Sequence, residues 1–70
     1  MDLNIAASLT SRECQVLELI GRGVRGPAIA QELGIAYFTL KKHRVNILRK
    51  LGLRGAAQLS VAAATFVANR

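Results

Sequence analysis

Residues 26–51 are GPAIAQELGIAYFTLKKHRVNILRKL, which contains two helical patterns separated by a glycine. Pro27 suits the first turn of a helix, because the amide hydrogen that it lacks has no intrahelical acceptor there. Gly34 can adopt a positive φ at no steric cost, as the residue that ends a helix often must. Only Gly34, Ile35 and Ala36 lie between the two patterns. The stretch therefore predicts a helix-turn-helix.

Helical patterns also flank this stretch on both sides. Thr10 followed by Glu13 is a capping box that predicts a helix start, and the pattern after it ends at Gly21. An alanine-rich helical pattern follows Gly55, and no alternating apolar stretch predicts a strand. We expect an all-α, four-helix bundle-like domain over residues 9–70, preceded by a leader or linker remnant at 1–8. The expected helices span about 10–21, 27–33, 37–51 and 56–68.

Charge is distributed unevenly along the 70 residues. Ten lysines and arginines face four acidic residues, which gives a net charge of +6, and no acid follows Glu32. A basic cluster of this kind predicts a surface that binds a polyanion. The cluster falls within residues 41–54 and comprises Lys41, Lys42, Arg44, Arg49, Lys50 and Arg54.

Other function classes find little support in the sequence. The single Cys14 and single His43 make neither a disulfide nor a zinc site, and no nucleophile lies near a base, so we expect no enzyme, metal, cofactor or small-molecule ligand. The longest uncharged run, residues 55–69, is shorter than the roughly 20 residues of a membrane span. We expect a cytoplasmic protein that does not insert into membranes.

The helix expected over residues 37–51 has two distinct faces at about 100° per residue. Leu40, Ile47 and Leu51 form a narrow apolar stripe that should face the core. The opposite face carries cations, one valine and one phenylalanine, namely Phe38, Lys41, Lys42, Val45 and Arg49. Such a face suits a DNA major groove, where cations meet phosphates and guanine edges and an apolar group meets a thymine methyl.

Four motifs together resemble a known family: LTSRECQVL at 9–17, Gly23, IAQELGI at 29–35 and TLKKHRVNILRKL at 39–51. They are similar to the LuxR/FixJ-type (GerE-like) DNA-binding domain, found at the C-terminus of bacterial response regulators and quorum-sensing receptors. The resemblance implies a third helix in the major groove, a fourth helix that pairs with a second subunit, and action near promoters, commonly through RNA polymerase. By position it implies base contacts from Lys41, Lys42 and Val45. Implied phosphate contacts are Thr39, Asn46, Arg49 and Lys50, with Arg44 and Arg54 as weaker candidates.

The chain departs from the family pattern at three places. Residues 25–28, RGPA, replace a polar run, which leaves Arg25 as the substitute phosphate contact. Ala36 stands where a Ser or Thr cap is expected, at a cost of about 1 kcal/mol. Tyr37 and Phe38 replace a small and an acidic residue. Either they contact sugars or thymine methyls, or they pack against the turn.

The last helical pattern carries two apolar stripes. Leu59, Ala62, Ala63 and Phe66 suffice to close a core. Because small residues let helices approach closely, the second stripe predicts a weak homodimer contact; it comprises Ala57, Val61, Ala64 and Ala68.

The sequence thus predicts a sequence-specific regulator of transcription that binds double-stranded DNA as a homodimer. A sigma-factor-like promoter-binding domain and a basic helical module for protein interaction or membrane-surface contact remain as alternatives.

Overall fold

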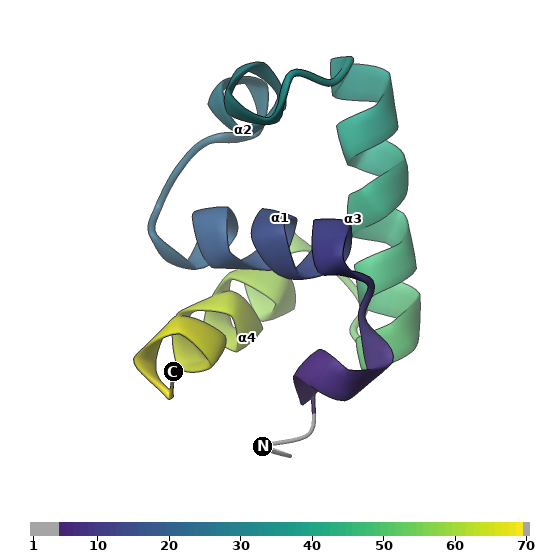
Figure 1. Ribbon diagram of the computed structural model, residues 1–70. Helices are drawn as coiled ribbons and strands as arrows, with labels where there is room; N and C mark the ends of the chain where they lie inside the picture. Colours follow the sequence, from purple (N-terminus) through teal and green to yellow (C-terminus); the bar gives the residue numbers. More distant parts are fainter. Residues whose placement is uncertain (1–4, 70) are drawn as a thin grey trace.

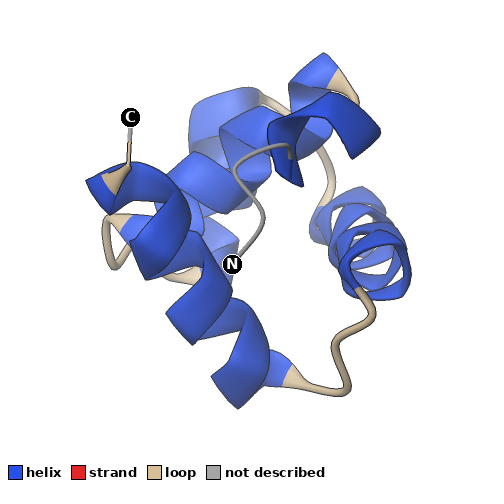
Figure 2. Cartoon of the chain, turned by 90° about the horizontal axis from the view of Figure 1, so that it is seen from below, coloured by secondary structure: helices blue, strands red, loops and turns tan. Residues whose placement is uncertain are grey.

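The computed structural model describes residues 5–69, which form helices joined by short loops, with no strand in that range (Figures 1 and 2). A short 3-10 helix, η1 (Ile5–Ser8), precedes four α-helices: α1 (Ser11–Gly21), α2 (Gly26–Leu33), α3 (Tyr37–Leu51) and α4 (Ala56–Ala68). The predicted all-α fold and its four helices are confirmed, each boundary to within one residue. Of the predicted leader, residues 5–8 form η1, and residues 1–4 lie outside the described range.

Helix α1 lies at the centre of the arrangement (Figure 1). It contacts all three other helices, with α2 on one side and α4 on the other, and α3 runs along the side of the molecule. The α2–α3 pair is the predicted helix-turn-helix. Gly34 ends α2 in the left-handed conformation, with φ 67° and ψ 34°, as its position predicts.

The helix starts differ in how they are capped. The Thr10 hydroxyl accepts a hydrogen bond from the Glu13 amide at 3.1 Å, and Glu13 Oε1 accepts one from the Thr10 amide at 2.9 Å. The predicted capping box is therefore confirmed. Ala36 at the start of α3 provides no side-chain cap, as expected from its methyl group.

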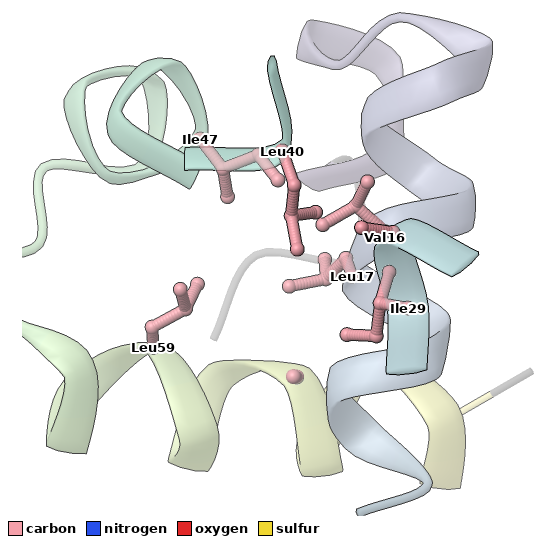
Figure 3. Close-up of a cluster of buried hydrophobic side chains, with 8 residues drawn as sticks. Val16, Leu17, Ile29, Leu40, Ile47 and Leu59 are labelled. Atoms are coloured by element: carbon pink, nitrogen blue, oxygen red, sulfur yellow. The ribbon is translucent and has the colours of Figure 1, made fainter. Parts of the chain in front are cut away.

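Each of the four helices contributes apolar side chains to a single core (Figure 3). Leu40 and Ile47 point from α3 toward Val16 and Leu17 of α1. The core also contains Ile29, Ala30, Leu59 and Ala63. Since Leu40 and Ile47 are fully buried, the rotation of α3 about its axis is fixed, and its opposite face must point outward.

Helices α1 and α4 cross closely at Gly21. A Cβ atom at this position would collide with the backbone carbonyl of Ala63 and would lie 2.6 Å from Val67 Cγ2. In the sequence, Gly21 is marked only as the end of α1. The structure shows that it also provides the space that α4 needs to close the core.

Candidate nucleic-acid interface

The outward face of α3 carries the residues that the sequence placed there. Phe38, at 66% exposure, and Val45, at 51%, are exposed apolar side chains. Lys41, Lys42 and Arg49 are exposed between and beyond them. The orientation of the face follows from the burial of the opposite side, and since no acid follows Glu32 in the sequence, α3 contains no negative charge.

A shallow groove runs along this face. It is lined by Phe38, Lys41, Lys42, Val45, Asn46 and Arg49. All three residues predicted to contact bases thus lie together in the groove, with two of the predicted phosphate contacts, Asn46 and Arg49. A surface that offers both cations and apolar groups can bind a polyanion and also contact its less polar parts.

Two lysines of the groove lie over aromatic rings one turn earlier in α3. Lys41 Nζ lies 5.6 Å from the centroid of the Tyr37 ring, and Lys42 Nζ lies 4.8 Å from that of Phe38. Cation–π contacts at such distances are worth about 0.5–1 kcal/mol at exposed sites. They restrict where the two ammonium groups lie before any ligand is bound.

The two aromatic residues differ in their surroundings. A Cβ built on Gly26 would lie 3.0 Å from Tyr37 Cε1 and 3.3 Å from its hydroxyl oxygen, so the Tyr37 ring packs beside the start of α2. Phe38 instead points out of the fold and lines the groove. Tyr37 therefore lies beside the start of α2, at the opposite end of that helix from the turn at Gly34, whereas Phe38 lies in the groove.

Arg25 and Arg44 lie beside a hollow at the start of α2. Arg25 is the N-cap residue of α2 and makes no side-chain cap there. Arg44 Nη1 lies 3.4 Å from the Cβ position built on Gly26, which places this α3 side chain next to the α2 start. Free backbone amides at a helix start attract anions, so the two predicted phosphate contacts lie where a phosphate would be stabilised.

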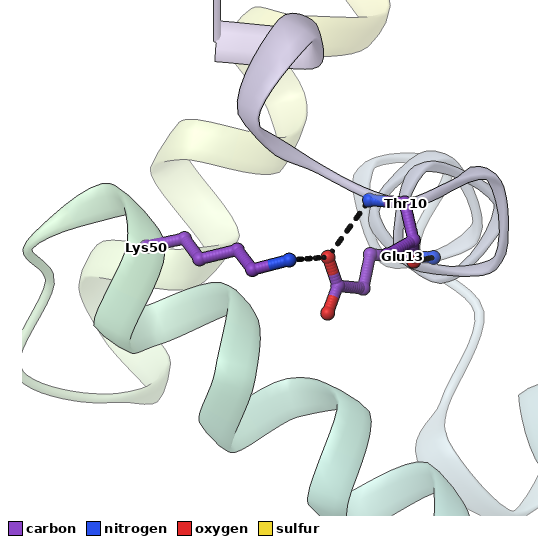
Figure 4. Close-up of polar contacts among 3 residues, drawn as sticks. All are labelled: Thr10, Glu13 and Lys50. Carbon is purple, nitrogen blue, oxygen red and sulfur yellow. Dashed lines mark hydrogen bonds and ion pairs between the residues drawn. The ribbon is translucent and has the colours of Figure 1, made fainter.

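Lys50 has a role that the sequence did not indicate (Figure 4). Its Nζ donates a hydrogen bond of 2.7 Å to Oε1 of Glu13, the same oxygen that accepts from the Thr10 amide. The Glu13 side chain is 4% exposed and that of Lys50 is 37% exposed. Lys50 therefore neutralises a buried carboxylate and links α3 to the start of α1.

The same contact changes the acidity of Glu13. The hydrogen bond from Lys50, followed by that from the Thr10 amide, lowers the pKa of the Glu13 carboxyl below its ordinary value of 4.5, against the opposing effect of burial. The carboxylate is thus ionised at neutral pH although it is buried. The sequence indicates only the capping role of Glu13, because nothing in the spacing of two residues 37 positions apart signals their contact.

Two predicted phosphate contacts remain, Thr39 on α3 and Arg54 after the end of α3. Thr39 is half-buried on α3. Arg54 is exposed in the loop between α3 and α4, where its backbone amide donates a 2.7 Å hydrogen bond to Gln58 Oε1.

Helix α4 presents a second, uncharged outer face. Its inner face buries Leu59, Ala62 and Ala63, with Phe66 half-buried against the core. The four residues predicted to form a dimer contact are all exposed: Ala57, Val61, Ala64 and Ala68. Val61 is 66% exposed and is the largest of them.

Comparison with known proteins assigns the chain to a family. The model of the bacterial regulatory proteins of the luxR family matches residues 7–63, which is more than half of the chain. The chain belongs to the LuxR family. It is a helix-turn-helix DNA-binding domain of a transcriptional regulator, in a family of regulators rather than enzymes, and the resemblance seen in its motifs is confirmed.

Individual relatives agree with this assignment. The chain is 39% identical over 57 residues, 81% of its length, to the transcriptional regulatory protein TdiR of Thauera aromatica. It is 42% identical over 52 residues, 74% of its length, to the transcriptional regulatory protein UhpA of Salmonella typhimurium. It is 38% identical over 58 residues, 83% of its length, to LnrK of Bacillus subtilis. The chain spans about a quarter of the length of these relatives (25–26%).

No solved structure gives a significant match to the chain. Within residues 5–69, no single helix is long and apolar enough to cross a membrane; only α3 and α4 taken together, bent by 78°, have the length and composition for it.

Proposed function

We propose that this LuxR-family domain binds double-stranded DNA sequence-specifically, with α3 in the major groove. The observation that carries the proposal is the outer face of α3, which combines exposed cations with Phe38 and Val45 and lacks any acid. An α-helix fits the width of the major groove, and base edges there offer both hydrogen-bond acceptors and thymine methyls. A face that only bound phosphates would gain nothing from exposed apolar groups.

The residues of the groove divide into two roles in this proposal. Lys41, Lys42 and Val45 contact base edges from the middle of the face. Phosphates on either side are held by cations and polar groups at the edges and ends of the helix pair: Arg25, Thr39, Arg44, Asn46, Arg49 and Arg54. Lys50 keeps free donor capacity for a phosphate, because an ammonium has three hydrogens and Glu13 accepts one bond from it.

Two domains would bind as a homodimer through α4. The exposed stripe of Ala57, Val61, Ala64 and Ala68 is free of charge and made of small side chains, which permits close approach of a second α4. A two-fold dimer would place two α3 helices on a repeated half-site. The contact is small, so we expect dimers to form on DNA rather than in dilute solution.

In the cell, the domain would act near promoters in the bacterial cytoplasm, with RNA polymerase as a protein partner. Residues 9–70 would be the DNA-binding unit and residues 1–8 its leader or linker. This context is what membership of the LuxR family implies.

Selection of a randomised duplex pool on the purified chain, followed by sequencing, tests the proposal. We expect an enriched motif with two-fold symmetry. Salt-sensitive binding without any motif would contradict the sequence-specific function, and absence of binding at low salt would favour an acidic protein partner.

The dimer is tested by comparing duplexes that contain one or two half-sites. Val61→Glu should abolish cooperative binding to the paired site and leave affinity for a single half-site unchanged, because it places a charge in the α4 contact. Gln15→Glu, which makes the same change of charge on the exposed side of α1, is the control. Equal cooperativity in both variants would exclude α4 as the dimer contact.

A further inference from the structure

Phe38 is an apolar side chain for which the fold itself has no use. It is the second residue of α3 and is 66% exposed, whereas the core of the described residues is complete without it. Its neighbour Tyr37 lies beside Gly26 at the start of α2 and is 44% exposed, so Phe38 is the more exposed of the two rings. Phe38 and Val45 place two exposed apolar groups in one basic groove, which suits a partner that has an apolar part.

Helical spacing aligns Phe38 with the other residues of the groove. Phe38, Lys42, Val45 and Arg49 follow one another at intervals of four, three and four residues, so they form one row along α3. Lys42 Nζ lies 4.8 Å from the centroid of the Phe38 ring, which holds the ammonium beside the phenyl group. The row thus offers an apolar group and a hydrogen-bond donor side by side at the start of α3.

We propose that Phe38 recognises the 5-methyl group of a thymine in the major groove, beside a base edge contacted by Lys42. This inference rests on the proposed function, since it assumes that α3 enters the groove. The N-terminal residues of a recognition helix are those that contact base edges. Among the groups that base pairs present in the major groove, the thymine methyl is the apolar one, and a phenyl ring is a suitable partner for it.

A sugar contact is the competing role for an exposed ring at the edge of the groove. It would add affinity to every duplex alike, because the deoxyribose is the same at each position. A methyl contact depends on the base instead. The two roles are therefore separated by a change that removes only the methyl group.

The experiment replaces single thymines with uracil in one half-site of a duplex chosen by the pool selection. Uracil keeps the base pair and lacks the 5-methyl group. At one of these positions, replacing thymine with uracil should weaken the binding of the unmodified chain to the duplex about fourfold. This is the effect of losing one buried methyl-sized apolar group. Phe38→Ala should bind the thymine duplex more weakly and be indifferent to uracil at that position, and Phe38→Leu should keep part of the sensitivity.

Val45→Ala is the matched control, since Val45 lies two turns further along the same row. The Val45→Ala variant should still bind more weakly when uracil replaces the thymine that is assigned to Phe38. Urea midpoints of the variants confirm that each is folded, which is expected because both side chains are exposed.

The outcomes distinguish the inference from the function on which it rests. A selected motif whose binding ignores every single uracil, or a Phe38→Ala variant as sensitive as the unmodified chain, would overturn the role of Phe38 and leave sequence-specific binding intact. If no motif is enriched, both fail together.

Discussion

Replacing Lys50 with methionine is expected to destabilise the fold through Glu13, which precedes it by 37 positions in the sequence. Methionine keeps an apolar stem of similar length and removes the ammonium. Glu13 would then retain its hydrogen bonds with Thr10 and lose its only cationic partner among the described residues, while its side chain stays 4% exposed. The buried carboxylate would then have only the hydrogen bond from the Thr10 amide to stabilise its charge.

The magnitude follows from the unequal exposure of the two partners. A hydrogen bond to a charged group contributes about 1.5–3 kcal/mol when buried, whereas an exposed ion pair contributes about 0.2–1 kcal/mol. Because Lys50 is 37% exposed, water screens part of the interaction, and we expect a loss of about 1–2 kcal/mol. For a domain of this size, about 1 kcal/mol corresponds to a fall of roughly 4–8 °C in Tm.

Urea unfolding of a double-mutant cycle measures this coupling. The cycle combines Lys50→Met with Glu13→Gln, and Lys41→Met is the control for losing one positive charge from α3. A coupling energy near zero, or equal losses for Lys50→Met and Lys41→Met, would refute the argument that the buried carboxylate depends on Lys50.

Acid provides an independent check of the same contact. The pKa of Glu13 is lowered in the folded state, so the stabilisation is complete above its ordinary value of 4.5 and is lost as pH falls through the lower folded-state value. The difference in unfolding free energy between the unmodified chain and Lys50→Met should therefore be full at neutral pH and shrink as the pH falls below 4.5. A difference that is constant over this range would show that the carboxylate is not the group concerned.

Further substitutions test other parts of the account. Gly21→Ala should lower the free energy of unfolding by about 1–3 kcal/mol, because the added methyl collides with the Ala63 carbonyl of α4. An unchanged urea midpoint would contradict the close crossing of α1 and α4. Ala36→Ser should stabilise the domain by about 0.5–1 kcal/mol by capping α3, and a lower Tm would show that the α3 start has no room for a cap. Arg49→Ala should weaken binding to all duplexes alike. It should also reduce the slope of log affinity against log salt concentration by about one, the effect of losing one phosphate contact. A change of preferred sequence would mean that Arg49 contacts bases.

The four helices were predictable because their signals are local. A capping box at Thr10, glycines at the helix ends and the 3.6-residue period each act within one helix or turn. The outer face of α3 was predictable for the same reason, since burial of Leu40 and Ile47 fixes the direction of every other side chain on the helix.

Contacts between helices were not predictable in the same way. The pairing of Glu13 with Lys50 depends on how α1 and α3 cross, and the period of neither helix determines that crossing. The close approach at Gly21 has the same origin, since glycine in a sequence signals a helix end as readily as a crossing point. The division of roles between Tyr37 and Phe38 became clear only once the start of α2 was placed beside Tyr37.

The most direct test of the central claim compares Lys42→Ala with the unmodified chain on the selected duplex and on a scrambled duplex at one salt concentration. If the outer face of α3 contacts base edges, the variant should lose about 1–3 kcal/mol on the selected duplex and much less on the scrambled one, so that its specificity ratio falls. Equal losses on both duplexes would mean that Lys42 binds only the phosphate backbone and would contradict the proposed contact of this face of α3 with base edges.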